Sequence, residues 1–365
     1  MKRADIEALQ HQRNKWVVRY CYDNVPFYRE KMDKAGVNPD KIKCLSDTKY
    51  IPLTTKSALR ETYPFGMFAT PIKDIVRIHA SSGTTGKPTV VGYTQNDLNN
   101  WAEMMARIVT AAGADENTIV QIAFGYGMFT GALGLHYGLE KIGATVVPCS
   151  TGNSQKQLMF MRDFKTNALV ATPSYALYLS ELAKELEYPM SDYNLKLGLL
   201  GSEGCTPEMR GQIEKNWGMF VTDNYGLSET GGPGMSGECR ERNGLHINED
   251  FFYCEIIDPD TEEVLPPGST GELVVTTLTK EGIPMLRYRT RDITRIVYEP
   301  CKCGRTTARK DKIKGRSDDM LIIRGVNVFP SQVESVIVGI EELGPHYQLV
   351  VRREGFSDTL EVQVE

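Results

Sequence analysis

Residues 81–89 form a stretch rich in hydroxyl groups and glycine, and its composition suits the binding of phosphate. The stretch reads Ser-Ser-Gly-Thr-Thr-Gly-Lys-Pro-Thr and follows the apolar run 75–80. Glycines let backbone N–H groups turn toward an anion, hydroxyls add donors, and Lys87 adds a positive charge. The pattern is not a Walker A loop, because Ser81 replaces the first glycine and Pro88 follows the lysine. We predict a phosphate-binding turn between two strands; the alternative is an ordinary flexible turn.

Two further polar segments each follow a short apolar run. Residues 202–204 (Ser-Glu-Gly) follow the run 197–201, and residues 223–226 (Asp-Asn-Tyr-Gly) follow 218–222. In open α/β sheets, ligands bind beyond the carboxyl ends of the strands. We therefore expect both polar segments to lie at strand ends and to line one crevice. A third polar segment ends at Asp292, which, taken alone, is better explained by a salt bridge with Arg289 or Arg291.

Cys301 and Cys303 are one residue apart and are followed by glycine, a pattern that can chelate a soft divalent cation. A tetrahedral zinc ion needs two more ligands. Cys239 and His246 lie in the preceding loop and could supply them, with Cys254 in reserve. We predict a closed, structural Zn²⁺ site at Cys239, His246, Cys301 and Cys303. The alternative is a pair of turn cysteines that bind no metal.

The composition is that of an ordinary globular protein. The chain has 365 residues, enough for more than one domain, with 41% hydrophobic and 24% charged residues. A net charge of -5 argues against a nucleic-acid partner, since no basic excess is available to neutralise phosphates. We see no 18-residue apolar run and no signal peptide, so we expect no membrane association and a cytoplasmic location. Eight cysteines are too few for a disulfide scaffold.

Strands and helices alternate along the chain, which predicts an α/β fold with largely parallel sheets. We expect helices over 6–35, interrupted at 24–26, and over 96–112 and 131–142, and strands over 118–124, 144–148, 168–172 and 197–201. Short strands and turn residues over 252–298 predict a more antiparallel subdomain. Beyond residue 315 we expect a short strand, a helix over 330–340 and two strands near 347–351 and 359–364.

In their order and spacing, these segments resemble the adenylate-forming superfamily of acyl-coenzyme A synthetases. Residues 79–89, 224–229 and 324–330 are similar to the phenylacetate-coenzyme A ligase family in particular. The resemblance implies a large N-terminal adenylate-forming domain of layered sheets and helices (1–315) and a small mobile α+β C-terminal domain (316–365) that pivots at Asp318. In the family this small domain continues to a lysine that promotes attack on the α-phosphate. No residue here matches that segment, so we expect the domain to be truncated.

The resemblance also implies the chemistry. A carboxylate attacks the α-phosphate of ATP to give an acyl-adenylate and pyrophosphate, and the thiol of coenzyme A then displaces AMP. Such reactions depend on placement and charge neutralisation. The implied catalytic residues are Lys87, Glu229 and Arg316, and Glu229 binds Mg²⁺, a hard cation that prefers oxygen ligands. The implied ATP and AMP ligands are Ser81, Ser82, Gly83, Thr84, Thr85, Gly86, Lys87, Ser202, Glu203, Gly204, Asp223, Asn224, Tyr225, Gly226, Asp292 and Arg316.

Aromatic residues and glycines suggest where the acid binds. We expect the acyl pocket at Phe124, Tyr126, Gly127, Phe129 and Pro173; the alternative is that the aromatic residues are plain core. The family implies phenylacetate as the substrate and a homodimer, and related aryl acids such as indoleacetate stay open. Two other functions also stay open: an adenylating domain that loads a carrier protein, and a catalytically impaired, nucleotide-binding zinc scaffold.

Overall fold

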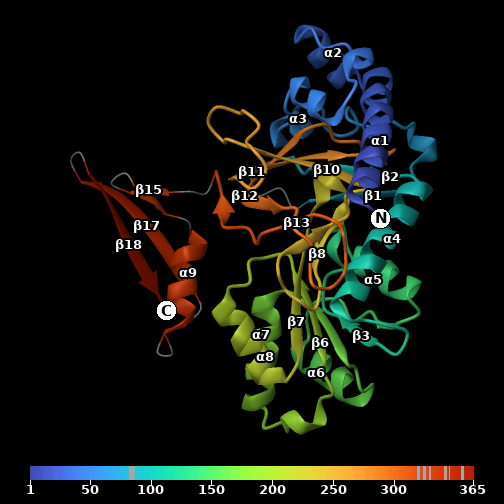
Figure 1. Ribbon diagram of the computed structural model, residues 1–365. Helices are drawn as coiled ribbons and strands as arrows, with labels where there is room; N and C mark the ends of the chain where they lie inside the picture. Colours follow the sequence, from blue (N-terminus) through green and yellow to red (C-terminus); the bar gives the residue numbers. More distant parts are fainter. Residues whose placement is uncertain are drawn as a thin grey trace.

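The fold is built around a long mixed sheet (Figure 1). The structure, a computed structural model, describes residues 1–81, 87–318, 321–323, 326–328, 330–340, 343–344, 346–354 and 357–365. Within these residues the sheet has 12 strands in the order β10-β11-β12-β13-β9-β8-β7-β6-β5-β3-β4, and β14 pairs with β12 at one side. The sheet is parallel from β4 to β7 and antiparallel from β7 to β10.

The parallel half confirms the predicted α/β pattern. Its strands are β3 (Ile119–Ile122), β4 (Thr145–Val147), β5 (Ala168–Ala171), β6 (Leu197–Gly201) and β7 (Phe220–Leu227). Helices α4 (Gln95–Ala112) and α5 (Gly131–Lys141) lie on one side of β6 and β7, and α7 (Pro173–Glu185) and α8 (Pro207–Trp217) lie on the other (Figure 1). Helix α6 (Ser154–Asp163) belongs to the α7 and α8 side.

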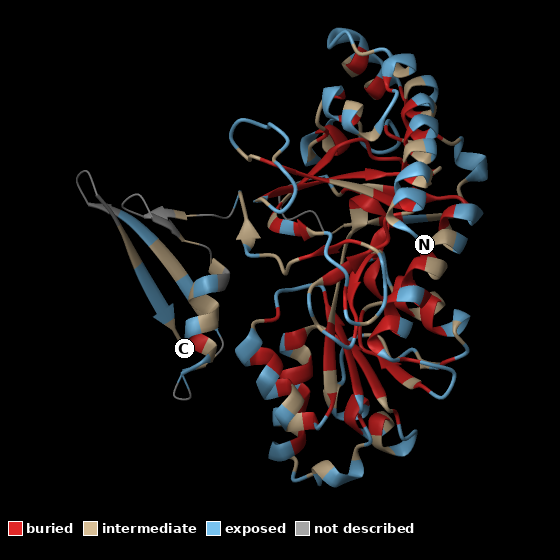
Figure 2. Ribbon diagram, viewed as in Figure 1, coloured by how far each residue is buried: buried red, intermediate tan, exposed pale blue. Residues whose placement is uncertain are grey.

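Strand β5 shows how the sequence creates two cores. Successive side chains of a strand point to opposite faces. Ala168 and Val170 join the core that contains α4 and α5, while Leu169 and Ala171 join the core formed with α6, α7 and α8. All four residues are fully buried, so the strand reads as a continuous apolar run rather than an alternating one. The buried sheet between two helical layers is visible in Figure 2.

The antiparallel half also agrees with the sequence. Its strands are β8 (Gly232–Glu238), β9 (Leu245–Ile247), β10 (Phe252–Ile257), β11 (Thr270–Thr277), β12 (Tyr288–Val297), β13 (Arg309–Lys310) and β14 (Gly315–Arg316). Near this half lie the N-terminal helices α1 (Arg3–Asn24), α2 (Pro26–Lys34) and α3 (Lys56–Glu61) (Figure 1). Short 3₁₀ segments are η1 (Pro39–Lys41), η2 (Leu45–Tyr50), η3 (Ile72–Asp74), η4 (Met190–Asp192) and η5 (Ser228–Thr230).

The glycine-rich stretch connects two strands, as predicted. Strands β1 (Arg77–Ala80) and β2 (Val90–Tyr93) pair antiparallel, with Ala80 opposite Val90. Ser81 closes the base of the turn, because its N–H donates to the carbonyl of Thr89 at 3.0 Å. The predicted phosphate ligands Ser82, Gly83, Thr84, Thr85 and Gly86 lie outside the described residues.

One strand differs from the prediction. We expected Asp223, Asn224, Tyr225 and Gly226 to follow a strand, but β7 runs through them to Leu227. The reason is a partner that the sequence does not reveal: β8 pairs with β7 there, with Asn224 opposite Gly237 and Tyr225 opposite Ser236. The register shifts after Tyr225, at a β-bulge. Bulges redirect side chains and are common beside active sites.

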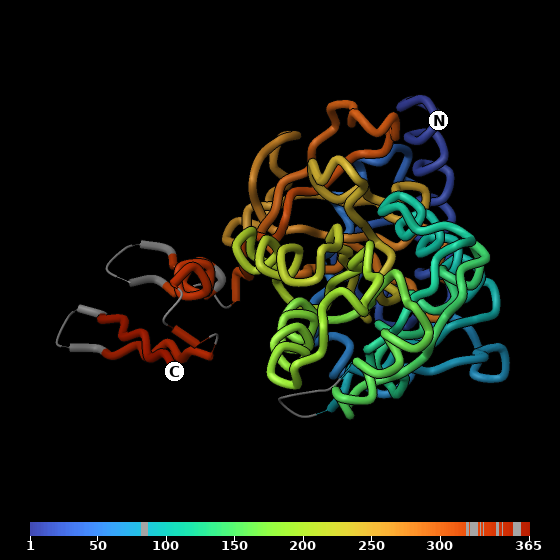
Figure 3. The backbone as a smooth tube through the Cα atoms, turned by 90° about the horizontal axis from the view of Figure 1, so that it is seen from below, coloured from blue at the N-terminus to red at the C-terminus, as the bar shows by residue number. Residues whose placement is uncertain are grey.

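The last part of the chain forms a separate α+β unit (Figures 1 and 3). Its elements are β15 (Leu321–Ile323), β16 (Val326–Val328), α9 (Pro330–Val338), β17 (Tyr347–Glu354) and β18 (Ser357–Val364), close to the predicted ones. Strands β17 and β18 pair along their whole length. The hydroxyl of Ser335 on α9 donates to Glu208 on α8 at 2.9 Å, which joins this unit to the large one.

Candidate active site and metal centre

A cavity of roughly 530 Å³ lies where β6 ends and β7 meets β8. It collects residues from distant parts of the chain. Among those that line it are Ser81, Phe124, Phe129, Ser202, Glu203, Gly204, Asp223, Asn224, Tyr225, Gly226, Glu229, Asp292 and Arg316. The sequence-based expectation that segments 202–204 and 223–226 share one crevice is therefore confirmed. Asp292 and Arg316 enter the same cavity because β12 and β14 pair with these two residues opposite each other.

Tyr225, Asp292 and Arg316 form a connected group on the cavity wall. The Tyr225 hydroxyl donates to Asp292 Oδ2 at 2.5 Å, and Arg316 Nη1 lies 3.6 Å from Asp292 Oδ1. Burial raises the pKa of Asp292, whereas the Tyr225 hydrogen bond and the Arg316 charge oppose that rise. The group presents a carboxylate beside an aromatic ring, an arrangement suited to a nucleoside.

The salt-bridge alternative for Asp292 is wrong. Arg289 pairs with Glu272 at 2.7 Å, and Arg291 lies 3.5 Å from the same carboxylate. Glu272, on the neighbouring strand β11, is fully buried and forms ion pairs with both Arg289 and Arg291. This leaves Asp292 facing the cavity, an arrangement that the spacing of residues 288–292 did not reveal.

Asp223 lines the same cavity. Burial, together with the nearby Glu238 carboxylate, raises the pKa of Asp223 to about 6. Glu238 is itself held by Arg210 at 2.8 Å and accepts the backbone N–H of Asp223 at 2.9 Å. A further cavity residue, Lys310 on β13, is 1% exposed and was not predicted from the sequence. No sequence motif surrounds Lys310. Its place in the cavity depends on the pairing of β13 with β9 and β12, which the sequence does not show.

Glu229 is a second buried carboxylate that lines the cavity, in addition to Asp292. Its Oε1 lies 3.2 Å from Lys56 Nζ, at the start of α3. Glu229 is 5% exposed, so a positive partner offsets part of the cost of burying its charge. Lys56 also lines the cavity and was missed by the sequence analysis, because it lies in a short helix with no recognisable motif. The position beside Glu229 thus favours a cation, the property expected of a Mg²⁺ ligand.

Lys87 is placed differently from the other predicted catalytic residues. It is exposed, its nitrogen lies 5.5 Å from the centre of the Tyr63 ring, and it is not among the residues that line the cavity. The other residues of its loop that were predicted to hold phosphate lie outside the described residues, apart from Ser81. The role of Lys87 therefore stays a prediction.

Only part of the predicted acyl pocket lines the cavity. Phe124 and Phe129 do, and Phe124 also belongs to the main core. Tyr126, Gly127 and Pro173 are not among the lining residues: Tyr126 hydrogen-bonds His136 Nδ1 at 3.0 Å, and Pro173 is the buried first residue of α7. Proline suits that position because the first turn of a helix has no use for its N–H.

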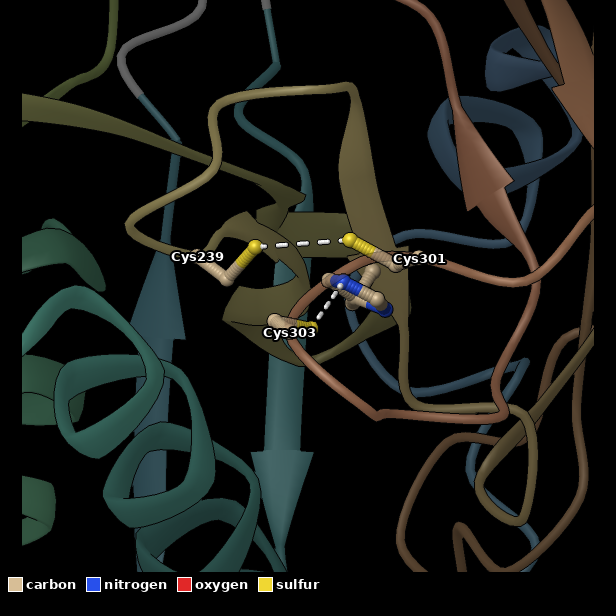
Figure 4. Close-up of side chains that lie close together, drawn as sticks. Cys239, Cys301 and Cys303 are labelled. Carbon is tan, nitrogen blue, oxygen red and sulfur yellow. Dashed lines mark hydrogen bonds between the residues drawn. The ribbon is translucent and has the colours of Figure 1, made fainter.

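Cys239, His246, Cys301 and Cys303 meet at one point, as the spacing predicted (Figure 4). Their four potential ligand atoms all lie within 4.8 Å of one another. The sulfurs of Cys239 and Cys301 are 3.8 Å apart, and Cys303 Sγ lies 3.3 Å from His246 Nε2. A tetrahedral zinc ion with bonds of about 2.3 Å to sulfur separates two thiolates by about 3.8 Å. The first separation is also much longer than a disulfide bond of about 2.05 Å.

The second nitrogen of His246 fits a ligand role as well. His246 Nδ1 lies 3.1 Å from the hydroxyl of Thr307, which leaves Nε2 directed at the cysteines. A partner on the other ring nitrogen is the usual way to orient a metal-binding histidine. Burial and the charges of Arg305 and Arg309 lower the pKa of His246 to about 4, so the ring is neutral at pH 7. Cys254, the reserve ligand, is not part of the group.

Comparisons with known proteins identify the family. Residues 5–279 match the family model described as AMP-binding enzyme, and residues 325–365 match the AMP-binding enzyme C-terminal domain. The phenylacetate-coenzyme A ligase of Escherichia coli K12 is 53% identical over 363 residues, which cover 99% of this chain and 82% of that protein. The chain belongs to the phenylacetate-coenzyme A ligase family. Within this family, the Thermus thermophilus enzyme is 52% identical over 100% of this chain and 82% of its own length.

Solved structures agree with the fold and the reaction class. 2-Hydroxyisobutyryl-CoA ligase in a postadenylation state superposes with a TM-score of 0.93 at 29% identity, covering 100% of this chain and 79% of that one. The same enzyme in its thioesterification state gives a TM-score of 0.84. The chain is thus an ATP-dependent acid–thiol ligase with an AMP-binding domain and a small C-terminal domain; it joins an acid to coenzyme A through an acyl-adenylate.

No described helix combines the length and the apolar character that a transmembrane segment requires.

Proposed function

We propose that this ligase activates phenylacetate. Four phenylacetate-coenzyme A ligases are 50–53% identical to the chain over nearly its whole length. The observation that carries the proposal is the cavity itself, because Phe124 and Phe129 line the same cavity as Tyr225 and Asp292. Aromatic rings favour an aryl group in offset or edge contact. An aryl acid would therefore lie beside the nucleotide in a single cavity.

The acid can be tested by binding, independently of turnover. Stable acyl-sulfamoyladenosines mimic the acyl-adenylate, and calorimetry can compare the phenylacetyl, indoleacetyl and acetyl forms on the wild-type chain. We expect the phenylacetyl form to bind tightest. Tighter binding of the indoleacetyl or acetyl form would contradict the assignment to phenylacetate.

We propose roles for the nucleotide residues from the family resemblance, and the positions of the residues that line the cavity support them. Tyr225 stacks on adenine, Asp292 accepts the ribose hydroxyls, and Arg316, 3.6 Å from Asp292, contacts the phosphate side of the nucleotide. Segment 202–204 completes the adenine edge of the cavity. Binding of the β- and γ-phosphates by segment 81–87 stays a proposal from the family resemblance, since residues 82–86 lie outside the described residues. Carboxylate acceptors on ribose add charge-assisted hydrogen bonds, which are about twice as strong as neutral ones.

Two metal ions complete the proposed function. Glu229 would hold Mg²⁺ together with the ATP phosphates, and the ion would neutralise charge on the departing pyrophosphate. The four ligands Cys239, His246, Cys301 and Cys303 would hold a structural Zn²⁺, with no free position for a substrate.

The larger organisation of the protein is also a proposal. We place the domain boundary between 1–315 and 316–365, with Asp318 as the hinge. Asp318 accepts two hydrogen bonds from Arg316, both at 2.9 Å, so rotation there would directly affect an active-site residue. We further propose a cytoplasmic homodimer. Analytical ultracentrifugation tests the dimer, and a single species at the monomer mass would contradict it.

A further inference from the structure

Lys310 is a buried lysine in the proposed nucleotide cavity, and it forms no ion pair with any residue that the structure describes. The residue is 1% exposed and lies on β13, between β9 and β12. Its nitrogen contacts the carbonyl oxygen of Asp311 at 3.4 Å and lies 4.0 Å from the centre of the Tyr225 ring. Across the described part of the chain, no carboxylate lies within 4.0 Å of this nitrogen. Buried charges are normally paired, so an isolated ammonium at this position calls for a functional explanation.

The surroundings of Lys310 are nevertheless acidic. The carboxylates of Asp223 on β7 and Asp292 on β12 both attract its charge, although neither makes a direct salt bridge. Burial lowers the pKa of Lys310 to about 8, and the two aspartates limit that fall, so the ammonium is charged at pH 7. In return, Lys310 favours the ionised forms of both aspartates.

We propose that Lys310 is a positioning residue for the nucleotide, whose ammonium holds the Tyr225 ring in place. This inference rests on the proposed role of Tyr225. A cation over the face of a tyrosine ring is attracted to it more strongly when the pair is desolvated, which favours a single orientation of the ring. Lys310 acts without touching the nucleotide, by fixing the placement of the Tyr225 ring that does.

Other charged groups near Asp223, Asp292 and Lys310 do not replace the effect of the Lys310 ammonium. Those that act on Asp223, Asp292 or Lys310 are Arg210 on α8, Glu238 on β8, Cys254 on β10, Arg316 on β14, and Asp311, Lys312 and Asp318 in the adjoining loops. Arg210 is engaged by Glu238, and Arg316 is shared with Asp318. Lys310 acts on both cavity aspartates and also lies over the Tyr225 ring.

The chain offers a matched control in Lys280. It too is buried, with a pKa lowered by burial to about 8, and its nitrogen lies 3.4 Å from the centre of the Tyr93 ring. Unlike Lys310, it is 3.4 Å from a carboxylate, that of Asp97, and it does not line the nucleotide cavity. Loss of Lys280 thus tests the cost of removing a buried lysine without affecting the nucleotide.

The experiment is calorimetric titration of AMP into the wild-type chain and the K310M, K310R and K280M variants at pH 7.5 and 9.5. At pH 7.5 we expect K310M to bind AMP about tenfold more weakly, because the cation that holds the Tyr225 ring is lost. K310R and K280M should bind like the wild type. Between pH 7.5 and 9.5 the affinity of the wild type and of K280M should fall as Lys310 loses its proton, whereas that of K310R should not.

The outcomes separate this inference from the proposed function. Failure of the wild-type chain to bind AMP would overturn the proposed nucleotide site itself. Wild-type affinity in K310M, or the same pH-dependent fall in K310R as in the wild type, would overturn the role of Lys310 alone. The pH comparison between the wild type and K310R decides the matter even if K310M does not fold.

Discussion

Removal of zinc should loosen the loop that joins β12 to β13. Cys301 and Cys303 lie in this loop, and Cys239 and His246 lie at β8 and β9 on the other side of the proposed ion. The strands at the two ends of the loop carry Asp292 and Lys310. A bound ion therefore cross-links segments that are distant in sequence and adjoins the strands of the active site.

The size of the effect can be worked from the separation of the ligands. Cys239 and Cys301 are 62 residues apart. Closing a loop of that length by a cross-link removes unfolded-state entropy worth about 4 kcal/mol at 25 °C. With an unfolding entropy of about 2 cal/mol/K per residue, a chain of this size should lose roughly 6 °C in Tm when the cross-link is lost.

The assay is thermal unfolding of the purified chain before and after chelation, followed by re-addition of Zn²⁺, with metal content measured by mass spectrometry. We expect one zinc per chain and a Tm that falls on chelation and recovers with zinc. C303S should behave like the chelated wild type. C44S is the matched control, because Cys44 is exposed and lies outside the cluster, and it should respond to chelation like the wild type. Absence of zinc from the purified chain, together with a Tm that added zinc does not change, would refute the reasoning.

Two further predictions concern stability. A Cβ on Gly134 would lie 2.6 Å from the Trp101 ring, so G134A should destabilise the chain by about 1–3 kcal/mol. Gly211 has open space around it, so G211A should stabilise helix α8 by about 0.5–1 kcal/mol. Equal Tm shifts in the two variants would contradict the packing at Gly134. The raised pKa of Asp223, about 6 when folded against 3.8, means that its ionisation costs stability as the pH rises from about 4 to about 6, and that the cost is complete above pH 6. D223N should therefore gain more Tm, relative to the wild type, at pH 8 than at pH 5, and a larger gain at pH 5 would reverse the sign of this reasoning.

The sequence predicted the parts of the site that depend on local pattern. The turn after β1, the crevice formed by segments 202–204 and 223–226, and the cluster of three cysteines and one histidine all follow from residue types and spacing. The alternation of apolar runs with helices also gave the parallel half of the sheet and the elements of the C-terminal unit, because strand and helix periods are visible in sequence.

The rest depended on pairing between distant strands. Strand β7 continues past Thr222 because β8 covers its edge, and the sequence does not show that partner. Lys310 is buried because Ile296 and Leu245 pair opposite it on two neighbouring strands. Lys56, in a short helix, forms an ion pair with Glu229, which lies 173 residues later in the sequence. A lysine on a surface-like segment gives no local sign that its charge will lie in a cavity.

The central claim is tested most directly by product analysis. The chain is incubated with phenylacetate, MgATP and coenzyme A, and AMP, ADP and phenylacetyl-coenzyme A are quantified by mass spectrometry for the wild type and D292N. We predict AMP and thioester in equal amounts without ADP, and a loss of about 10- to 150-fold in kcat/KM for ATP in D292N, the effect of removing hydrogen bonds to a charged group. Production of ADP, or undiminished thioester formation by D292N, would contradict the account.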